Sequence, residues 1–202
     1  MLVLASSSPR RIKLLREWAY SFATVIAPVE EEVIPGFPPM AMVRRLAESK
    51  AAAGVQKWRD SGGRADDLVL SADTVVVLDN KILGKPESPE VAKEMLKLLS
   101  GRTHAVLTGV ALQRLSGEGE SGVVETKVSF RQLAEEEIDQ YIATGEPMDK
   151  AGAYGIQGGA SGFVANFEGS YTNVVGLPME YVSERLKAWG IEQGVIAPRE
   201  VE

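Results

Sequence analysis

The stretch Leu68–Leu78 limits the choice of fold most strongly, because it is an almost unbroken apolar run. A run of this length, followed by the turn residues Asp79 and Asn80, is typical of a buried strand. Ser71-Ala72-Asp73-Thr74 interrupts it. An aspartate inside a buried strand is costly unless it meets a cation, a metal ion or several hydrogen-bond donors. We therefore interpret Asp73 as a functional residue.

One difficulty accompanies this interpretation. Successive side chains of a regular strand point to opposite faces, so Asp73 and Thr74 are expected on different sides of the sheet. Both can serve one site only if the strand ends or kinks there, or if a ligand wraps around its end.

Segments with strand and helix patterns alternate along the chain, which is typical of an α/β protein. We expect strands near 2–5, 22–27, 68–78, 104–114 and 123–131, and a short return strand that ends at 83. We expect helices near 9–19, 40–59, 91–99, 134–143 and 179–189. An acidic, proline-rich loop is expected over 28–39 and a glycine-rich segment over 145–162. The sequence predicts a single domain over residues 1–196 and a loose tail over 197–202.

The composition excludes several classes of protein. The chain has 202 residues, no cysteine and one histidine, which exclude a disulfide framework, a thiolate metal site and a multi-histidine cluster. A net charge of −6 argues against broad binding of nucleic acid polymers. No apolar run reaches the roughly 18 residues of a membrane span, and the first residues lack the apolar core of a signal peptide. We expect a cytoplasmic protein without a nucleic acid or membrane partner.

The segment Ser6-Ser7-Ser8-Pro9-Arg10-Arg11 joins a short apolar run to a stretch with helical spacing. Ser8 is expected at the N-cap and Pro9 at the first helical position. A helix start offers free N–H groups and a partial positive charge, and two arginines follow it. The segment predicts a phosphate site, and the alternative is a capped surface helix with solvated arginines.

Other polar residues have two interpretations each. Lys50 falls in the apolar stripe of the helix expected over 40–59, where it is a functional cation or a lysine that packs its stem and solvates its ammonium. Glu30-Glu31-Glu32 is a solvated acidic face or a carboxylate pair for a divalent ion. Lys85 follows a hairpin and is uninformative by itself. We expect His104 to be structural, because no partner spacing is evident.

The glycine-rich segment 149–159 allows a close approach of the backbone to a ligand, or it forms a structural loop. It does not match the GxGxxG fingerprint, and the chain contains no GxxxxGK[ST] phosphate loop. The usual dinucleotide-binding and P-loop interpretations are therefore excluded.

Together these segments resemble the Maf family of nucleoside triphosphate pyrophosphatases. The matching segments occur in family order: LASSSPRR at 4–11, EE at 30–31, LAESKA at 46–51, SADTVV at 71–76, GKP at 84–86, SGRTH at 100–104 and GEPMDKAGAYGIQG at 145–158. One such segment would be a weak signal, whereas the ordered set spans nearly the whole chain and is highly specific.

The resemblance implies a two-lobed α/β fold, similar to inosine triphosphatases, with a mixed bent sheet flanked by helices and a central cleft. It implies metal-dependent hydrolysis of a nucleoside triphosphate between the α and β phosphates, in a cytoplasmic homodimer. By the same resemblance Asp73 is the general base, Glu31 lies at the active site, and the triphosphate is lined by Arg11, Lys50, Lys85 and the serines Ser6 and Ser8. Asp73 and Glu31 are expected to hold Mg²⁺ or Mn²⁺, and whether Asp73 is a metal ligand or the base stays open.

Three positions indicate the branch of the family. Arg10, Thr74 and Gln157 match the branch that resembles dTTP/UTP pyrophosphatases. The Gln157 amide can donate and accept at once, which suits the edge of uracil or thymine. The alternatives are a pyrophosphatase for 7-methyl-GTP, or a nucleotide-sensing regulator of septum formation without significant turnover.

Overall fold

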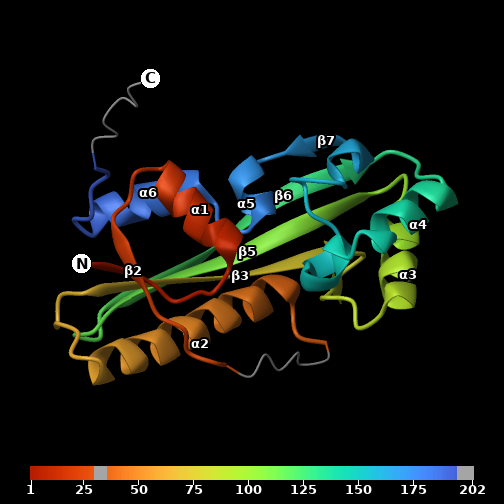
Figure 1. Ribbon diagram of the computed structural model, residues 1–202. Coiled ribbons are helices and arrows are strands. Elements are labelled where there is room, and N and C mark those ends of the chain that lie inside the picture. Colours follow the sequence, from red (N-terminus) through yellow and green to blue (C-terminus); the bar gives the residue numbers. More distant parts are fainter. Residues whose placement is uncertain (30–35, 195–202) are drawn as a thin grey trace.

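The computed structural model describes residues 1–29 and 36–194 (Figure 1). The strands are β1 (Leu2–Leu4), β2 (Phe22–Thr24), β3 (Leu68–Leu78), β4 (Lys81–Leu83), β5 (Thr103–Arg114), β6 (Gly119–Phe130) and β7 (Val164–Glu168). The helices are α1 (Pro9–Glu17), α2 (Pro39–Asp60), α3 (Pro89–Leu99), α4 (Glu135–Ala143), α5 (Tyr171–Val175) and α6 (Met179–Ala188). Short 3₁₀ turns follow α4: η1 (Glu146–Asp149), η2 (Ala151–Ala153) and η3 (Ser161–Phe163).

The strands form one mixed sheet in the order β2-β1-β3-β5-β6-β7, with β4 also paired to β3. β1 runs parallel to β2 and to β3, whereas the other neighbours are antiparallel. The prediction of an α/β protein with a mixed sheet flanked by helices is therefore confirmed. The described residues contain no helix long and apolar enough to cross a membrane.

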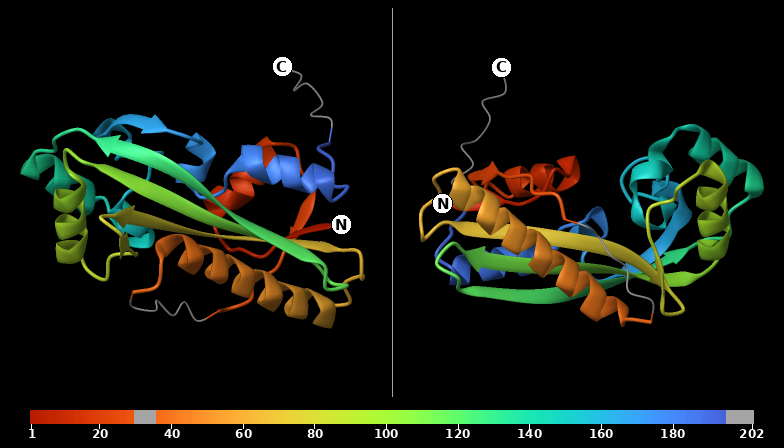
Figure 2. Two further views of the ribbon diagram at one scale, coloured as in Figure 1. Left: turned by 180° about the vertical axis from the view of Figure 1, so that it is seen from behind. Right: turned by 90° about the horizontal axis from the view of Figure 1, so that it is seen from below.

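The two faces of the sheet are covered differently (Figure 2). α2 lies along one face. α1, α5 and α6 lie on the opposite face, α1 and α6 at the end near β1 and α5 over β5 and β6. On that opposite face the apolar side chains form two cores. One gathers around Leu70 and Leu112 under α1 and α6, and the other around Val76 and Phe130 beside α3 and α4. The two lobes that the family resemblance implies stay a prediction.

Small residues let α2 approach the sheet closely. Ala47 and Ala51 of α2 pack with Ala111 of β5 in a buried cluster. A Cβ atom at Gly109 of β5 would overlap the main-chain carbonyl of Val43, so this position accepts only glycine without a shift of α2. This close contact sets the distance between the inward side chains of α2 and β3.

The structure differs from the sequence prediction in its second half. β6 begins at Gly119 rather than at 123, and β7 and α5 were not predicted. The glycine-rich segment, expected to be irregular, contains the three 3₁₀ turns. Glu31 and the expected tail 197–202 lie outside the described residues.

Candidate active site

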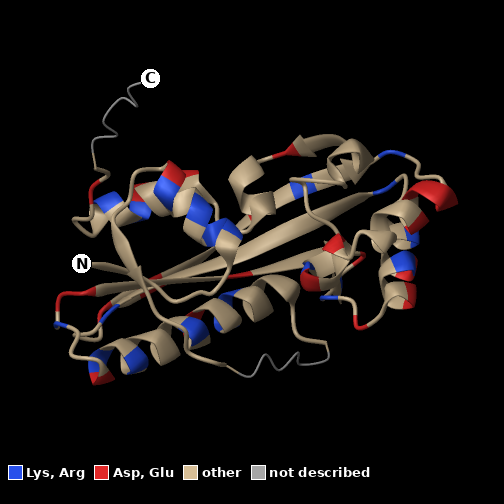
Figure 3. Ribbon diagram, in the orientation of Figure 1, with Lys and Arg blue, Asp and Glu red and all other residues tan. Residues whose placement is uncertain are grey.

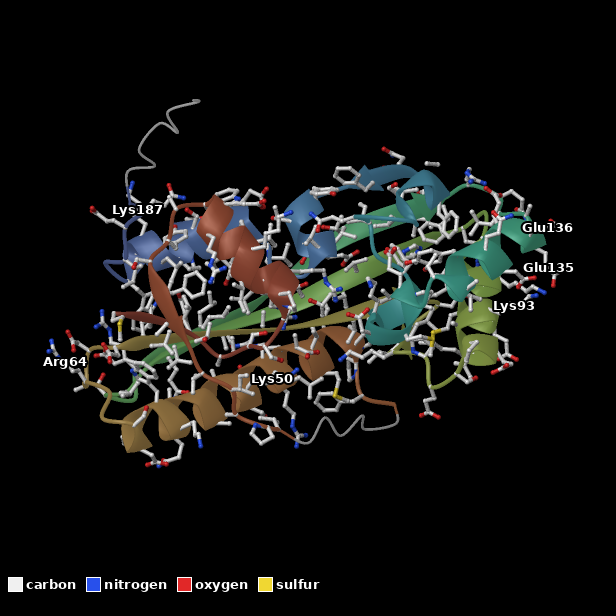
Figure 4. The ribbon with its side chains drawn as sticks, viewed as in Figure 1. Lys50, Arg64, Lys93, Glu135, Glu136 and Lys187 are labelled. Atoms are coloured by element: carbon white, nitrogen blue, oxygen red, sulfur yellow. The ribbon has the colours of Figure 1, made fainter. Side chains whose placement is uncertain are left out.

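The buried aspartate of β3 is paired with a lysine of α2. Lys50 Nζ lies 2.5 Å from Asp73 Oδ1, and the two side chains are only 19 % and 10 % exposed. Figure 4 shows Lys50 on the side of α2 that faces the sheet. A cation is one of the three kinds of partner that a buried aspartate was expected to need, and Lys50 provides it. The functional roles of Asp73 and Lys50 stay predictions.

The helix–sheet contact around this pair is fixed by a second polar bond. Ser71, one strand repeat before Asp73, donates its buried hydroxyl to the carbonyl oxygen of Ala47 at 2.6 Å. Ala47 lies about one turn before Lys50 on α2. The bond therefore holds the lysine-bearing turn of α2 over the aspartate.

Thr74 points to the opposite face of β3, where it contacts Arg11 of α1. Arg11 Nη2 donates to Thr74 Oγ1 at 3.2 Å, and Arg11 Nε donates to the carbonyl oxygen of Gly176 at 2.8 Å. Gly176 caps the C-terminus of α5 with a positive φ of 124°. The negative end of a helix favours a cation, so this carbonyl both orients and stabilises the guanidinium.

The first loop completes this second group. Ser6 Oγ accepts from Arg11 Nη1 at 3.4 Å and from the amide of Ser8 at 3.2 Å. Ser8 Oγ in turn accepts from the amide of Arg11, and Pro9 opens α1, as the sequence predicted. Basic residues lie along α1 in Figure 3. A hydroxyl-rich loop and an oriented arginine thus meet at a helix start, which is a favourable arrangement for an anion.

The strand neither ends nor kinks between Asp73 and Thr74, because its pairing with β5 continues from Leu68 to Val77. The two residues therefore do lie on opposite faces. On its other edge β3 pairs with β1 as far as Leu70 and with β4 only from Val76. Within the described residues no strand covers the edge between these points. A ligand that reaches both faces has to pass around this edge, rather than around the end of the strand.

A chain of buried polar groups supports Thr74. Thr74 Oγ1 lies 2.9 Å from Thr108 Oγ1 of β5, and Thr108 donates to the carbonyl oxygen of Asn173 at 3.3 Å. Asn173 is fully buried and donates its side-chain amide to Thr126 Oγ1 and to the carbonyl of Val106, both at 3.0 Å. These groups lie between the two apolar cores. Sequence reasoning missed them, although a threonine within the apolar run of β5 was a detectable signal.

The remaining predicted residues lie on loops around these two groups. Arg10 Nη1 forms an ion pair with Asp149 Oδ2 at 3.4 Å, which links α1 to the glycine-rich segment. Lys85 is exposed, and its loop is joined to that segment by a bond from the amide of Gly152 to the carbonyl of Gly84 at 3.0 Å. Gln157 is exposed in the same segment. Neither Lys85 nor Gln157 contacts the Asp73 or Arg11 groups through a described bond.

His104 belongs to the second apolar core. Its Nε2 lies 2.7 Å from Tyr154 Oη, and its ring packs edge-on against Phe130 and Tyr154. Burial lowers the pKa of His104 to about 4, so the imidazole is neutral near neutral pH. Tyr154 follows η2, and the contact therefore anchors the glycine-rich segment to β5. This placement suits the structural role that the sequence indicated.

The metal-binding capacity of the site rests on few ligands. Within the described residues no three His, Asp or Glu side chains gather in a group able to hold a metal ion. Among the residues that the structure describes, Asp73 supplies the carboxylate of the site. A single carboxylate fits Mg²⁺ or Mn²⁺, which bind through one or two carboxylates together with substrate phosphates and water. Glu31, the other predicted ligand, lies outside the described residues.

A large hollow lies elsewhere in the molecule. A cavity of about 540 Å³ is lined by Arg114, Ser116, Trp189 and their neighbours near the β5–β6 turn. It contains none of the predicted site residues. The Lys50–Asp73 pair and the Arg11–Thr74 contact, rather than this cavity, therefore define the candidate site.

Comparison with known proteins shows the family to which this chain belongs. The family described as Maf-like protein matches residues 1–189, and the chain belongs to this family. It is 54 % identical over 202 residues to a dTTP/UTP pyrophosphatase of Desulfitobacterium hafniense, covering 100 % of this chain and 91 % of the relative. It is 48 % identical over 193 residues to a dTTP/UTP pyrophosphatase of Moorella thermoacetica, covering 95 % and 96 %. Among solved structures, a HAM1 protein from Coxiella burnetii aligns with a TM-score of 0.43 and 15 % identity over 93 % of this chain and 98 % of that chain, which supports no functional conclusion.

Proposed function

We propose that this protein hydrolyses dTTP and UTP to the nucleoside monophosphate and pyrophosphate. The observation that carries the proposal is the pair of groups on consecutive residues of β3. Lys50 and Asp73 lie on one face, and Arg11 and Thr74 on the other. Curated relatives at 45–54 % identity carry the name dTTP/UTP pyrophosphatase. Maf membership and this geometry together support a nucleoside triphosphate pyrophosphatase of that specificity.

The chemistry assigns a task to each group. A triphosphate is a strong anion, and charge-assisted bonds from Arg11, Lys50 and Lys85 offset its charge. The Ser6 and Ser8 hydroxyls and the start of α1 add neutral donors. Asp73 accepts the proton of the attacking water or orients that water toward the α-phosphate. Arg10, Thr74 and Gln157 face the nucleoside and select the base.

A divalent cation, Mg²⁺ or Mn²⁺, is part of the proposal. Asp73 and Glu31 would hold it together with the substrate phosphates, and when bound it polarises the phosphoryl oxygens and offsets their charge. Lys50 contacts one oxygen of the Asp73 carboxylate. In the absence of nucleotide, Lys50 neutralises the Asp73 carboxylate. When a nucleotide is bound, the Lys50 ammonium is available to a phosphate group.

Further parts of the proposal concern the whole chain. We propose one two-lobed domain over residues 1–196, which acts as a cytoplasmic homodimer with nucleotides, rather than nucleic acid polymers or membranes, as its partners. The family match over residues 1–189 and the net charge of −6 support this proposal. Size measurement by light scattering tests the dimer.

The decisive assay measures pyrophosphate released from dTTP, UTP, CTP and 7-methyl-GTP, each with Mg²⁺, Mn²⁺ or a chelator. We expect turnover of dTTP and UTP that the chelator abolishes.

Asp73→Asn should lower kcat about 10²- to 10⁴-fold, the usual contribution of a general base. Asp79→Asn at the end of the same strand, where Asp79 forms an exposed ion pair with Arg102, is the matched control and should keep full activity. Near-normal turnover by Asp73→Asn at saturating metal would contradict the assignment. Preferred hydrolysis of 7-methyl-GTP, or nucleotide binding without turnover, would establish one of the alternatives.

A further inference from the structure

The glycine-rich segment passes from one apolar core to the other just before Gln157. Tyr154 is buried in the core beside α3 and α4, whereas Ile156 is buried in the core under α1 and α6. Gln157, the next residue, is exposed. The ion pair between Asp149 and Arg10 joins the same segment to α1. An exposed side chain has few contacts of its own, so the position of Gln157 depends on the main chain on either side of it.

Two side chains, one from α4 and one from η1, hold that main chain. Tyr141 Oη accepts from the amide of Gly155 at 3.3 Å, and Glu146 Oε2 accepts from the amide of Gly159 at 3.1 Å. Tyr141 Oη also donates to Glu146 Oε1 at 3.2 Å, so the two acceptors are bonded to each other. These groups form a continuous bridge across residues 155–159, which we call the Tyr–Glu clamp.

The clamp is itself fixed in the fold. Tyr141 is buried, and its ring packs edge-on against Phe163 with the ring centres 5.3 Å apart. The carboxylate of Glu146 lies so close to the segment that a Cβ atom at Gly158 would be 2.8 Å from Glu146 Oε1. A main-chain amide that donates to a carboxylate forms a stronger bond than one that donates to a neutral oxygen. The Glu146 end of the clamp is thus both close to the main chain and charge-assisted.

We propose that Glu146 and Tyr141 are positioning residues, which hold the glycine-rich segment so that Gln157 meets the bound nucleotide. The inference rests on the proposed function, in which Gln157 faces the nucleoside. Neither residue contacts the Lys50–Asp73 pair through a described bond, so the clamp acts on nucleotide binding rather than on the hydrolytic step. Without the clamp the segment stays attached through its two buried side chains, but the stretch between Gly155 and Gly159 is no longer held in one conformation.

A double-mutant cycle in the full chain tests this role, with steady-state kinetics for UTP at saturating Mg²⁺. Gln157→Ala should raise KM about tenfold, the value of one hydrogen bond, with kcat within about twofold, because a contact made equally in the ground state and the transition state changes KM alone. Glu146→Ala should do the same. In the Gln157→Ala background, Glu146→Ala should change KM less than about twofold, since the side chain that it positions is already absent.

Glu137→Ala is the matched control. Glu137 also accepts from a main-chain amide, that of Ala134 at 3.0 Å, and from a side chain, but it does not contact the segment, so its variant should keep the KM. A tenfold rise caused by Glu146→Ala in both backgrounds would show a merely structural residue and overturn the inference. An unchanged KM in Gln157→Ala would also overturn it, while UTP hydrolysis would leave a pyrophosphatase. Absence of turnover with every nucleotide by the wild type would instead refute the proposed function, and this inference with it.

Amide hydrogen exchange, followed by NMR without nucleotide, tests the clamp directly. Glu146→Ala should speed exchange at Gly159 at least about tenfold, and Tyr141→Phe should do so at Gly155, because each variant removes the acceptor of that amide. The amide of Gly101, which is bonded outside the clamp, should exchange at the same rate in all three proteins. Unchanged exchange at Gly155 and Gly159 in these variants would overturn the inference.

Discussion

Replacement of Lys50 by methionine tests the central charge pair of the site. Lys50→Met keeps the length of the side chain but leaves the Asp73 carboxylate, which is 10 % exposed, without a cation. Lys50 is the only donor among the described residues that contacts this carboxylate. Loss of one partner of a buried pair costs about 3–5 kcal/mol, and partial exposure of Lys50 places the expected loss near the lower value, about 3 kcal/mol. For a chain of this size that corresponds to a fall in Tm of roughly 10 °C.

The assay is urea unfolding followed by circular dichroism, with Lys57→Met as the control. Lys57 is an exposed lysine on the same helix, so its variant should stay within about 0.5 kcal/mol of the wild type. The double variant Lys50→Met/Asp73→Asn also removes the carboxylate charge that Lys50→Met leaves without a cation. We expect it to recover about 2 kcal/mol of the loss, although neither variant should release pyrophosphate.

The reasoning fails if Lys50→Met unfolds at the same urea concentration as the wild type. It also fails if the double variant is no more stable than Lys50→Met. Either result would mean that water or another group solvates Asp73, so that the carboxylate does not depend on the lysine.

Two further predictions concern the two faces of the sheet. Because burial lowers the pKa of His104 from 6.5 to about 4, the folded state binds this proton less readily than the unfolded state, and stability is lost as the pH falls from 6.5 to 4. The unfolding free energy lost over this range amounts to about 3 kcal/mol. His104→Gln should show a shallower fall in unfolding free energy between pH 6.5 and pH 4. Identical pH profiles for the wild type and His104→Gln would exclude His104 as the source of this loss. Gly109→Ala should lower the unfolding free energy by about 1–3 kcal/mol, because the added Cβ overlaps the main-chain carbonyl of Val43 and α2 has to move. Gly162→Ala, where a Cβ meets nothing within 4 Å, is the control, and equal thermal melting of both alanine variants would contradict the close contact.

Much of the first half of the fold could be predicted, because its elements are long or strongly marked. β3 is a long and mostly apolar run, and α1 has its serine cap and proline. α5 was missed because five residues are too short to show helical periodicity. β7 was missed because it is mostly exposed, and therefore lacks an apolar alternation. β6 begins early because pairing with β5 holds Gly119, a residue that by itself indicates a turn.

The site followed a similar rule. Charged residues in apolar positions, such as Lys50 and Asp73, were found because burial of an unpaired charge is so costly. Thr108 and Asn173 were missed because a neutral side chain in an apolar run carries little penalty once it is bonded, and its partners are 34 and 67 residues away in sequence. Distant pairing of this kind follows from the sheet register, which the sequence alone does not specify.

The alternation of side chains along β3 has a consequence for how this enzyme changes over generations. Asp73 and Thr74 occupy consecutive codons, yet a β-strand separates their surroundings. If Thr74 selects the base as we propose, substitutions around α5 and β5 would change the choice of base, whereas substitutions around α2 would change the surroundings of Asp73. A variant with a new substrate preference could therefore keep the Lys50–Asp73 pair unchanged.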